Sequence, residues 1–331
     1  MKTAIIALTA GGYQLAHTIS GMLHKSSVDT RKIPVFEKMA SLWESDVDAI
    51  ICVMATGIVV RAIAPLCSDK KHDPCILVLD EKGQFVISLL SGHLGGGNEL
   101  SETLAVKLNA QAVITTASDV TGHTALDLWA AKNGLLAADK KKLTAVSAKI
   151  VNSGSVTIFT DCDVDQLPHD MVQTSDFSEA DIIVSDRIFP ECDALFLRPV
   201  AICIGIGCNR GTGAQAFETA ISELITEYKI SRDAVSCYAS IDLKSDETGM
   251  LDFIKNEKQS IHFYTKDELN SVDGVSSSTA VMKATGAKGV AEPAALLAAQ
   301  IKSSSTELIV RKHKWKDVTA AIAERKTILQ A

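Results

Sequence analysis

Aromatic side chains are scarce in this chain, at 5% of 331 residues, which argues against a stacking platform for bases or sugars. Basic residues are also outnumbered, because 33 Lys and Arg face 40 Asp and Glu and leave a net charge of −7. We therefore expect neither nucleic acid nor an anionic membrane as a partner. If the substrate is an anion, the positive potential that attracts it must be local.

Long apolar runs are absent too. No stretch of about 20 apolar residues occurs, so no membrane span is expected. The apolar start Ala4–Ala10 resembles a signal peptide, but no A-x-A-like cleavage site follows it, so a first β-strand is preferred. The eight cysteines have no C-x-x-C spacing, so the sequence signals neither a zinc ribbon nor a redox pair. Cys52 and Cys203 lie inside apolar runs as small buried residues, and these features favour a cytoplasmic protein.

What is present is an alternation of short β-rich runs with helical patterns, which is typical of α/β proteins. We predict two α/β domains with largely parallel sheets, residues 1–133 and 200–331, joined by a small α/β linking domain at 134–199. The apolar run Asp48–Met54 predicts a buried parallel strand. The segment Val318–Arg325, near the end of the chain, is predicted to be a helix.

The densest candidate site is a glycine-rich loop between a strand and a helix, with the sequence LLSGHLGGGNEL at residues 89–100. Such loops bring amide N–H groups together at a helix N-terminus, where they bind a carboxylate or phosphate or stabilise an oxyanion. His93 is a candidate general acid or base, and Glu99 can orient it. The alternative is a tight turn whose histidine caps backbone groups. The candidate anion-binding residues are Ser91, Gly95, Gly96, Gly97 and Asn98, the last of which is also the predicted N-cap.

Two further strand ends carry polar residues. Ligands of open parallel sheets bind beyond the carboxyl ends of the strands, so we expect the loop with Thr56 and Gly57 to share an edge with the glycine-rich loop. Arg61 either clamps a carboxylate there or forms a surface salt bridge. Thr116 and Asp119 follow a third strand on the same expected edge, and Asp119 is also a candidate N-cap.

The second large domain opens with another glycine-rich loop, IGIGCNRGTG at residues 204–213. It is similar to a dinucleotide fingerprint, but Arg210 stands where the third glycine belongs, which argues against NAD binding. Gly207 and Arg210 remain candidates for a second anion-binding loop. Lys244 either meets a substrate carboxylate or belongs to an ordinary charged helix start. Glu292 either complements a helix dipole or contacts the ligand.

Several strings along the chain are recognisable as a set: Gly57–Pro65 (GIVVRAIAP), Asp73-Pro74 with Asp80-Glu81, Leu89–Leu100, Ile114–Asp119, Gly205–Cys208 (GIGC), Ala239–Lys244 (ASIDLK) and Gly289–Glu292 (GVAE). In this order they resemble the cobalt-precorrin-5A hydrolase family of anaerobic cobalamin biosynthesis. The resemblance covers most of the chain and is weakest over residues 134–199.

The resemblance implies a reaction in which the δ-lactone of cobalt-precorrin-5A is hydrolysed and acetaldehyde is released, leaving cobalt-precorrin-5B. The cobalt belongs to the substrate, so no protein-bound metal or other cofactor is implied. The implied partner is a polycarboxylate tetrapyrrole, other enzymes of the pathway are candidate partners by analogy, and a homo-oligomer stays open. A rival hypothesis is a non-catalytic corrinoid carrier or scaffold subunit.

On this hypothesis the side chain of His93, aided by Glu99, transfers protons during lactone hydrolysis. The amides of Gly95–Gly97 hold an oxyanion or a substrate carboxylate. Arg61 and Arg210 act as further clamps on the carboxylates of the substrate.

Overall fold

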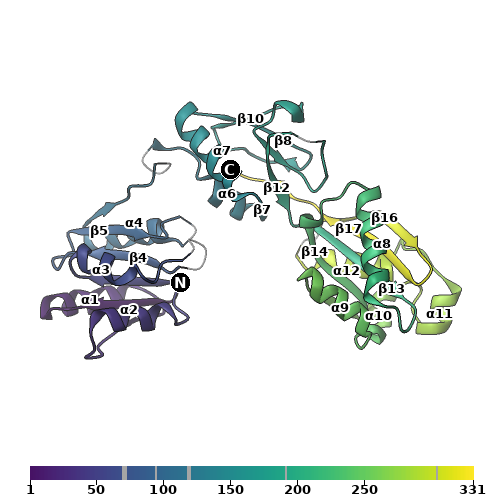
Figure 1. Ribbon diagram of the computed structural model, residues 1–331, viewed down its shortest axis with the longest axis horizontal. Helices are drawn as coiled ribbons and strands as arrows, with labels where there is room; N and C mark the ends of the chain where they lie inside the picture. The colour runs from purple at the N-terminus through teal and green to yellow at the C-terminus, as the bar shows by residue number, and fades with distance from the viewer. Residues whose placement is uncertain (69–72, 94, 118–120, 191, 303–304) are drawn as a thin grey trace. The chain divides into compact units, whose positions relative to one another are not determined.

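The computed structural model describes residues 1–68, 73–93, 95–117, 121–190, 192–302 and 305–331 (Figure 1). The chain divides into two units, Met1–Leu128 and Trp129–Ala331. Each unit is built from helices packed on largely parallel sheets, so the predicted α/β class is confirmed. The predicted domain boundaries after residues 133 and 199 stay predictions. No described helix has the length and apolar character needed to cross a bilayer.

The first unit contains a six-stranded sheet in the order β2-β1-β3-β4-β5-β6. Its strands are β1 (Thr3–Ala7), β2 (Ser26–Val28), β3 (Ala49–Val53), β4 (Cys75–Leu79), β5 (Phe85–Leu90) and β6 (Gln111–Val113). Helices α1 (Ala10–Met22) and α4 (Gly97–Leu108) cover one face, and α2 (Val35–Trp43) and α3 (Thr56–Ile63) cover the other. All residues of β1, β3 and β4 are buried, as continuous apolar runs require.

Strand direction separates two loops that we expected at one edge. The strands β1 to β4 are parallel, but β5 pairs antiparallel with β4. The reversal occurs at the turn Asp80–Gly83, where the Asp80 carboxylate accepts hydrogen bonds from the amides of Gln84 and Phe85, both at 2.8 Å. The loop that starts at Thr56 therefore lies at one edge of the sheet and the loop after Leu90 at the opposite edge. The expectation of a shared edge for these two loops was wrong.

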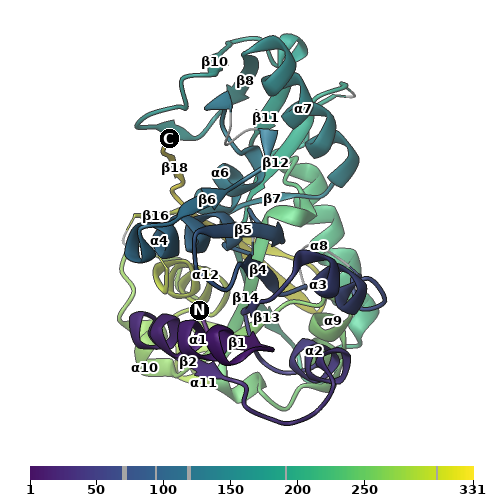
Figure 2. The ribbon, with the colours of Figure 1, turned by 90° about the vertical axis from the view of Figure 1, so that its left-hand side faces the viewer.

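The first part of the second unit holds a five-stranded sheet in the order β10-β8-β11-β12-β7. Only β7 runs antiparallel to its neighbour. The strands are β7 (Leu135–Ala137), β8 (Val156–Thr160), β10 (Met171–Gln173), β11 (Ile182–Val184) and β12 (Leu195–Pro199). Helix α6 (Leu126–Lys132) precedes this sheet, and α7 (Lys140–Ser153) packs on β8 and β12 (Figure 2). A short pair, β9 (Asp163–Val164) and β18 (Ile328–Leu329), joins this region to the end of the chain.

The remaining sheet has the order β15-β14-β13-β17-β16. Its strands are β13 (Ile202–Cys208), β14 (Val235–Ile241), β15 (Ile261–Tyr264), β16 (Thr306–Lys314) and β17 (Val318–Arg325). Helices α8 (Ala214–Glu227) and α9 (Thr248–Glu257) pack on one face, and α12 (Ala291–Gln300) packs on the other. The short helices α10 (Lys266–Asn270) and α11 (Thr279–Thr285) precede α12.

The predicted helix Val318–Arg325 is wrong, because this segment is strand β17. It pairs antiparallel with β13 on one side and with β16 on the other. Its alanines, although good helix formers, are buried in the sheet, and their small side chains let α12 lie close to it. The non-local pairing on both sides overrides the local helix propensity.

Candidate functional site

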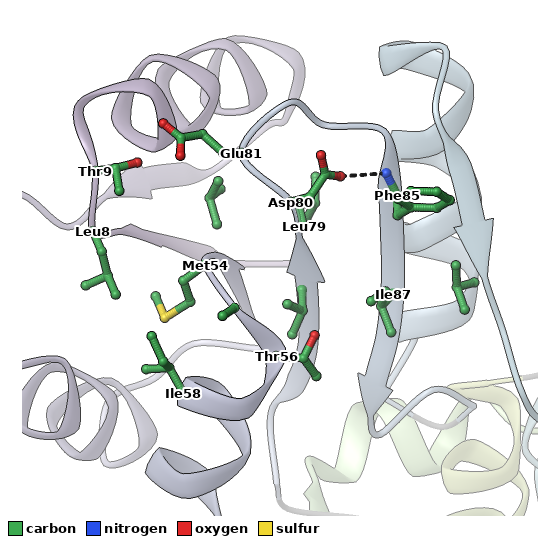
Figure 3. A pocket seen from close by; sticks show the side chains of 14 residues that line it. Leu8, Thr9, Met54, Thr56, Ile58, Leu79, Asp80, Glu81, Phe85 and Ile87 are labelled. Atoms are coloured by element: carbon green, nitrogen blue, oxygen red, sulfur yellow. Dashed lines mark hydrogen bonds between the residues drawn. The ribbon is translucent and has the colours of Figure 1, made fainter.

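A cavity of about 550 Å³ lies at the carboxyl ends of β1, β3 and β4 in the first unit (Figure 3). Its wall is mainly apolar, with Met54, Ile58 and Phe85 among the lining side chains. The predicted residue Thr56, which begins helix α3, also lines it. We call it the carboxyl-edge cavity.

The polar groups near this cavity are held by the protein itself. Asp80 closes the β4–β5 turn (Figure 3). The carboxylate of Glu81 lies against Gly11 in the first turn of α1, so closely that a Cβ on Gly11 would be 2.2 Å from Glu81 Oε1. Arg61 is exposed, and its Nη1 donates to the carbonyl of Gly57 at 2.9 Å. This hydrogen bond holds the Arg61 side chain against the first turn of its own helix, and the other guanidinium N–H groups can still donate to a ligand.

The glycine loop, residues 91–98, lies at the opposite edge of the same sheet. Its amides fold the loop: Gly96 N–H donates to the carbonyl of His93 and Asn98 N–H to that of Gly92, both at 2.8 Å. The N–H of Gly97 donates to the carbonyl of Ser91 at 3.4 Å. The amides of Gly96 and Gly97, two of the three that we expected to hold an anion, therefore donate to carbonyls within the loop.

The N-cap of α4 was predicted incorrectly. The helix begins at Gly97, and the cap position is Gly96, whose φ of +75° is a left-handed conformation that glycine adopts without strain. Asn98 lies inside the first turn, and its Nδ2 donates to Thr116 Oγ1 at 3.2 Å. Thr116 and the glycine loop therefore share an edge, as expected. Asp119 lies outside the described residues.

His93 forms an acid–base pair that local sequence did not reveal. Its Nδ1 lies 3.6 Å from Oδ1 of Asp127, at the start of α6, and both side chains are more than four-fifths buried. Glu99, the predicted orienting residue, is exposed on α4. A carboxylate beside one ring nitrogen orients the imidazole and selects which nitrogen carries the proton. This pair is therefore suited to general acid–base chemistry.

The second unit contains a cleft of about 330 Å³ at the carboxyl ends of β13 and β14. Gly207 and Lys244, both predicted from the sequence, line it. The N-terminal end of α12 also lines it, and an N-terminal helix end favours negative charge. The described lining further includes three lysines that sequence reasoning missed: Lys312, Lys314 and Lys316. We call this feature the lysine cleft, and it supplies the local positive charge that an acidic chain needs to attract an anion.

The loop beside the lysine cleft already binds an anionic group of the protein. The N–H of Gly211 donates to Glu247 Oε1 at 2.6 Å, and the buried Glu247 also lies 3.4 Å from Lys244 Nζ. Arg210 points to Asp246, with Nη1 2.5 Å from Oδ1, and this hydrogen bond holds the pKa of Asp246 below its ordinary value. Arg210 is not among the residues that line the cleft.

Glu292 binds the backbone of Lys312, a residue that lines the lysine cleft. It is 2% exposed, and its carboxylate accepts hydrogen bonds from Ser276 N–H at 2.6 Å, Ser276 Oγ at 2.9 Å and Lys312 N–H at 2.8 Å. Burial alone would raise the pKa of this carboxyl, but the hydrogen bonds hold it below its ordinary value. Three protein donors therefore occupy Glu292, which fixes the backbone of Lys312 at the cleft.

Comparisons with known proteins cover nearly the whole chain. Family models match in three parts: "Cobalamin synthesis G N-terminal" at residues 37–119, "Cobalamin biosynthesis central region" at 124–199 and "Cobalamin synthesis G C-terminus" at 202–323. The cobalt-precorrin-5A hydrolase of Priestia megaterium is 33% identical, over 97% of this chain and 94% of that protein.

Two further comparisons also extend over most of the chain. The cobalt-precorrin-5A hydrolase of Salmonella typhimurium is 32% identical, over 90% of this chain and 92% of that protein. A crystal structure of a cobalamin biosynthesis protein G homolog from Sulfolobus solfataricus is 21% identical, with a TM-score of 0.39, and covers 98% of this chain and 97% of that one.

Proposed function

Since this chain belongs to the cobalamin synthesis G family, we propose that it is a cobalt-precorrin-5A hydrolase of anaerobic cobalamin biosynthesis. The observation that carries the proposal is the 33% identity to a hydrolase of that name over 97% of the chain. The proposed reaction opens the δ-lactone and releases acetaldehyde, giving cobalt-precorrin-5B. The cobalt is part of the substrate, and we place the reaction in the cytoplasm.

The lysine cleft supports a polycarboxylate substrate. In this proposal Lys244, Lys312, Lys314 and Lys316 pair with carboxylates on the periphery of the macrocycle. Lys312, Lys314 and Lys316 are compact charges on flexible stems and can follow substrate side chains whose positions vary, whereas Lys244 is held beside Glu247. Because the chain as a whole is acidic, this local positive charge also directs the anionic substrate to the cleft.

The His93–Asp127 pair supports the proton transfers. In the first step His93 takes a proton from water as its oxygen adds to the lactone carbonyl, and the carbon–oxygen bond of the ring breaks to give an alkoxide. In the second step the alkoxide oxygen becomes the carbonyl oxygen of acetaldehyde, and the carbon–carbon bond that joins the carbon bearing it to the macrocycle breaks. The macrocycle accepts the electron pair of that bond and then a proton. We assign the orienting role to Asp127 rather than to Glu99, because Asp127 lies beside the ring and Glu99 is exposed.

Acetaldehyde release from cobalt-precorrin-5A tests the proposal against a non-catalytic carrier. Acetaldehyde is followed by NADH oxidation with added alcohol dehydrogenase, using wild type, His93→Ala and the control His17→Ala, which changes an exposed histidine of α1. We expect one acetaldehyde per substrate from wild type and His17→Ala, and strongly reduced release from His93→Ala. Tight corrinoid binding by wild type with no acetaldehyde would establish the carrier instead.

A further inference from the structure

A second charged cavity, of about 440 Å³, lies within the second unit, apart from the lysine cleft. Three of its walls are the segments that follow β8, β11 and β12, and the others come from β16, β17 and the residues after β17. The strands β8, β11 and β12 are parallel, so the cavity lies outside their carboxyl ends. This is the position where open α/β sheets bind ligands.

The cavity is strongly acidic. Its described lining carries two basic side chains, Arg187 and Lys326, and five carboxylates: Asp161, Asp163, Asp186, Glu307 and Glu324. Arg187 Nε lies 3.1 Å from Asp186 Oδ1, and Arg187 Nη2 lies 4.0 Å from Glu324 Oε2. One arginine is thus shared between two carboxylates, and the lining keeps an excess of negative charge. We call this feature the acidic cavity.

One carboxylate oxygen in the acidic cavity has no partner. Asp186 is 5% exposed, and its Oδ2 is buried without a hydrogen bond. Its neighbour Asp161 differs, because Oδ2 of Asp161 accepts a hydrogen bond from Ser185 Oγ at 2.6 Å. A buried carboxylate oxygen left without a donor is costly, and such groups are uncommon in folded proteins. Arg187 and Lys326 therefore leave Asp186 Oδ2 without a donor, and a ligand that carries positive charge could supply one.

The pKa values of the surrounding carboxyls agree with this shortage. Burial, followed by the charge of Asp186, raises the pKa of Glu324 to about 7 although Arg187 opposes the rise. Burial and Asp161 likewise raise the pKa of Asp186, against the effects of Arg187 and Arg198. Both shifts have the sign expected where positive charge is too scarce to stabilise the ionised carboxylates.

We propose that the acidic cavity binds an organic dication, an aliphatic diamine whose ammonium groups donate to Asp186 Oδ2 and to the carboxylate of Glu324 in the same lining. An ammonium group carries three donors and a positive charge, so it can donate to a buried carboxylate oxygen and offset its charge at the same time. Direct chelation of a metal fits less well, because among the described residues no three of these carboxylates bring oxygens within 4.8 Å of one another. The volume also exceeds what one ion requires.

Isothermal titration calorimetry of the full chain at pH 8 and low ionic strength tests this site. The probes are 1,4-diaminobutane, n-butylamine as the matched monocation, and MgCl₂. We expect one diamine per chain, weaker binding of the monoamine and still weaker binding of Mg²⁺. Absence of diamine binding to wild type, or Mg²⁺ binding more tightly than the diamine, would overturn the proposal.

Variants locate the binding. Asp186→Asn keeps the side-chain shape and should weaken diamine binding about tenfold or more, while leaving thermal stability equal or higher because an unpaired buried charge is gone. Glu324→Gln gives a second variant should Asp186→Asn fail to fold. The control Asp252→Asn changes an exposed carboxylate on α9 and should leave binding unchanged. Equal binding by wild type and by a folded Asp186→Asn or Glu324→Gln protein would place the diamine elsewhere and refute the assignment.

Discussion

Two glycine-rich loops of this protein look alike in sequence, and their surroundings differ. In the glycine loop the N–H groups of Gly96 and Asn98 donate to loop carbonyls, and in residues 209–213 the N–H of Gly211 donates to Glu247. In both loops, these amides are thus occupied by acceptors of the protein itself. Beside the first lies the His93–Asp127 pair, and beside the second lies the lysine cleft. We therefore assign the chemistry to the side chains of the His93–Asp127 pair and anion binding to those of the lysine cleft. Variants of the two sets should affect different kinetic constants.

The largest expected effect on activity comes from the acid–base pair. Asp127→Asn should lower kcat about a hundredfold with little change in KM, because the histidine loses the carboxylate that orients it. Glu99→Gln, which changes the exposed carboxylate of the same loop region, is the control and should stay within about twofold. Steady-state acetaldehyde release measures both. A larger loss in Glu99→Gln than in Asp127→Asn would reverse our assignment.

The next largest expected effect is on the free energy of unfolding, at Gly205 in strand β13. A Cβ on Gly205 would lie 1.9 Å from the carbonyl oxygen of Ala291, so α12 packs on the bare backbone of β13. Gly205→Ala should lower the free energy of unfolding by about 2 kcal/mol or more. Gly213→Ala is the control, with φ of −74° and nothing within 4 Å of its Cβ, and should change it by less than about 1 kcal/mol. Urea unfolding compares them, and equal losses would show that close packing is not the reason.

A smaller effect is expected from single lysines of the lysine cleft. Lys312→Ala or Lys314→Ala should raise KM about fivefold with kcat nearly unchanged, since each removes one charge pair to a multiply charged substrate. The effect should shrink as salt is added, because added ions screen the same attraction. Lys255→Ala, an exposed lysine of α9, is the control. A fall in kcat without a change in KM would assign these lysines to the chemistry.

The smallest effect is a contrast in pH dependence between Glu292 and Glu324. The pKa of Glu292 is lowered, so its contribution to stability is present above its ordinary value near 4.5 and is lost as pH falls through the lowered pKa. The pKa of Glu324 is raised to about 7, so its contribution is present below 4.5 and is lost as pH rises through about 7.

Replacing each glutamate by glutamine should reveal the opposite pH dependence of the two contributions to stability. Glu292→Gln should cost about 1–2 kcal/mol at pH 7, because it loses hydrogen bonds to a charged acceptor, and progressively less as pH falls below 4.5. Glu324→Gln should stabilise the protein at pH 8 and have no effect at pH 4. Thermal unfolding of wild type and each variant at the low and the high pH measures the change in stability. If this change has the same pH dependence in both variants, the environments assigned to Glu292 and Glu324 are wrong.

The sequence predicted most elements because their signals are local. The run Asp48–Met54 contains strand β3, as predicted. Cys52 and Cys203 are fully buried, as their apolar neighbours indicated. Segment Val318–Arg325 failed because its strand conformation depends on β13 and β16, which are distant in the chain. The prediction that two loops share one edge was wrong because β5 runs antiparallel to β4, which places the loop after β5 at the opposite edge.

The candidate site was predictable in part. The position of His93 in a glycine-rich loop is a local feature, but its partner Asp127 comes from another element, and no spacing rule connects them. The lysine cleft did carry a signal: Lys312, Lys314 and Lys316 alternate, which places them on one side of an extended segment. The apolar residues Leu308–Val310 predict a short strand that ends before the first of these lysines, so the alternation was missed.

Single-turnover acetaldehyde release with saturating enzyme tests the division between chemistry and binding most directly, because the rate then reports the chemical step alone. The comparison is between His93→Ala and the double variant Lys312→Ala/Lys314→Ala. We predict that His93→Ala is slower than wild type by about a hundredfold or more, whereas the double variant is within about twofold once enzyme saturates the substrate. A normal rate in His93→Ala, together with a slow rate in the lysine variant, would contradict the account.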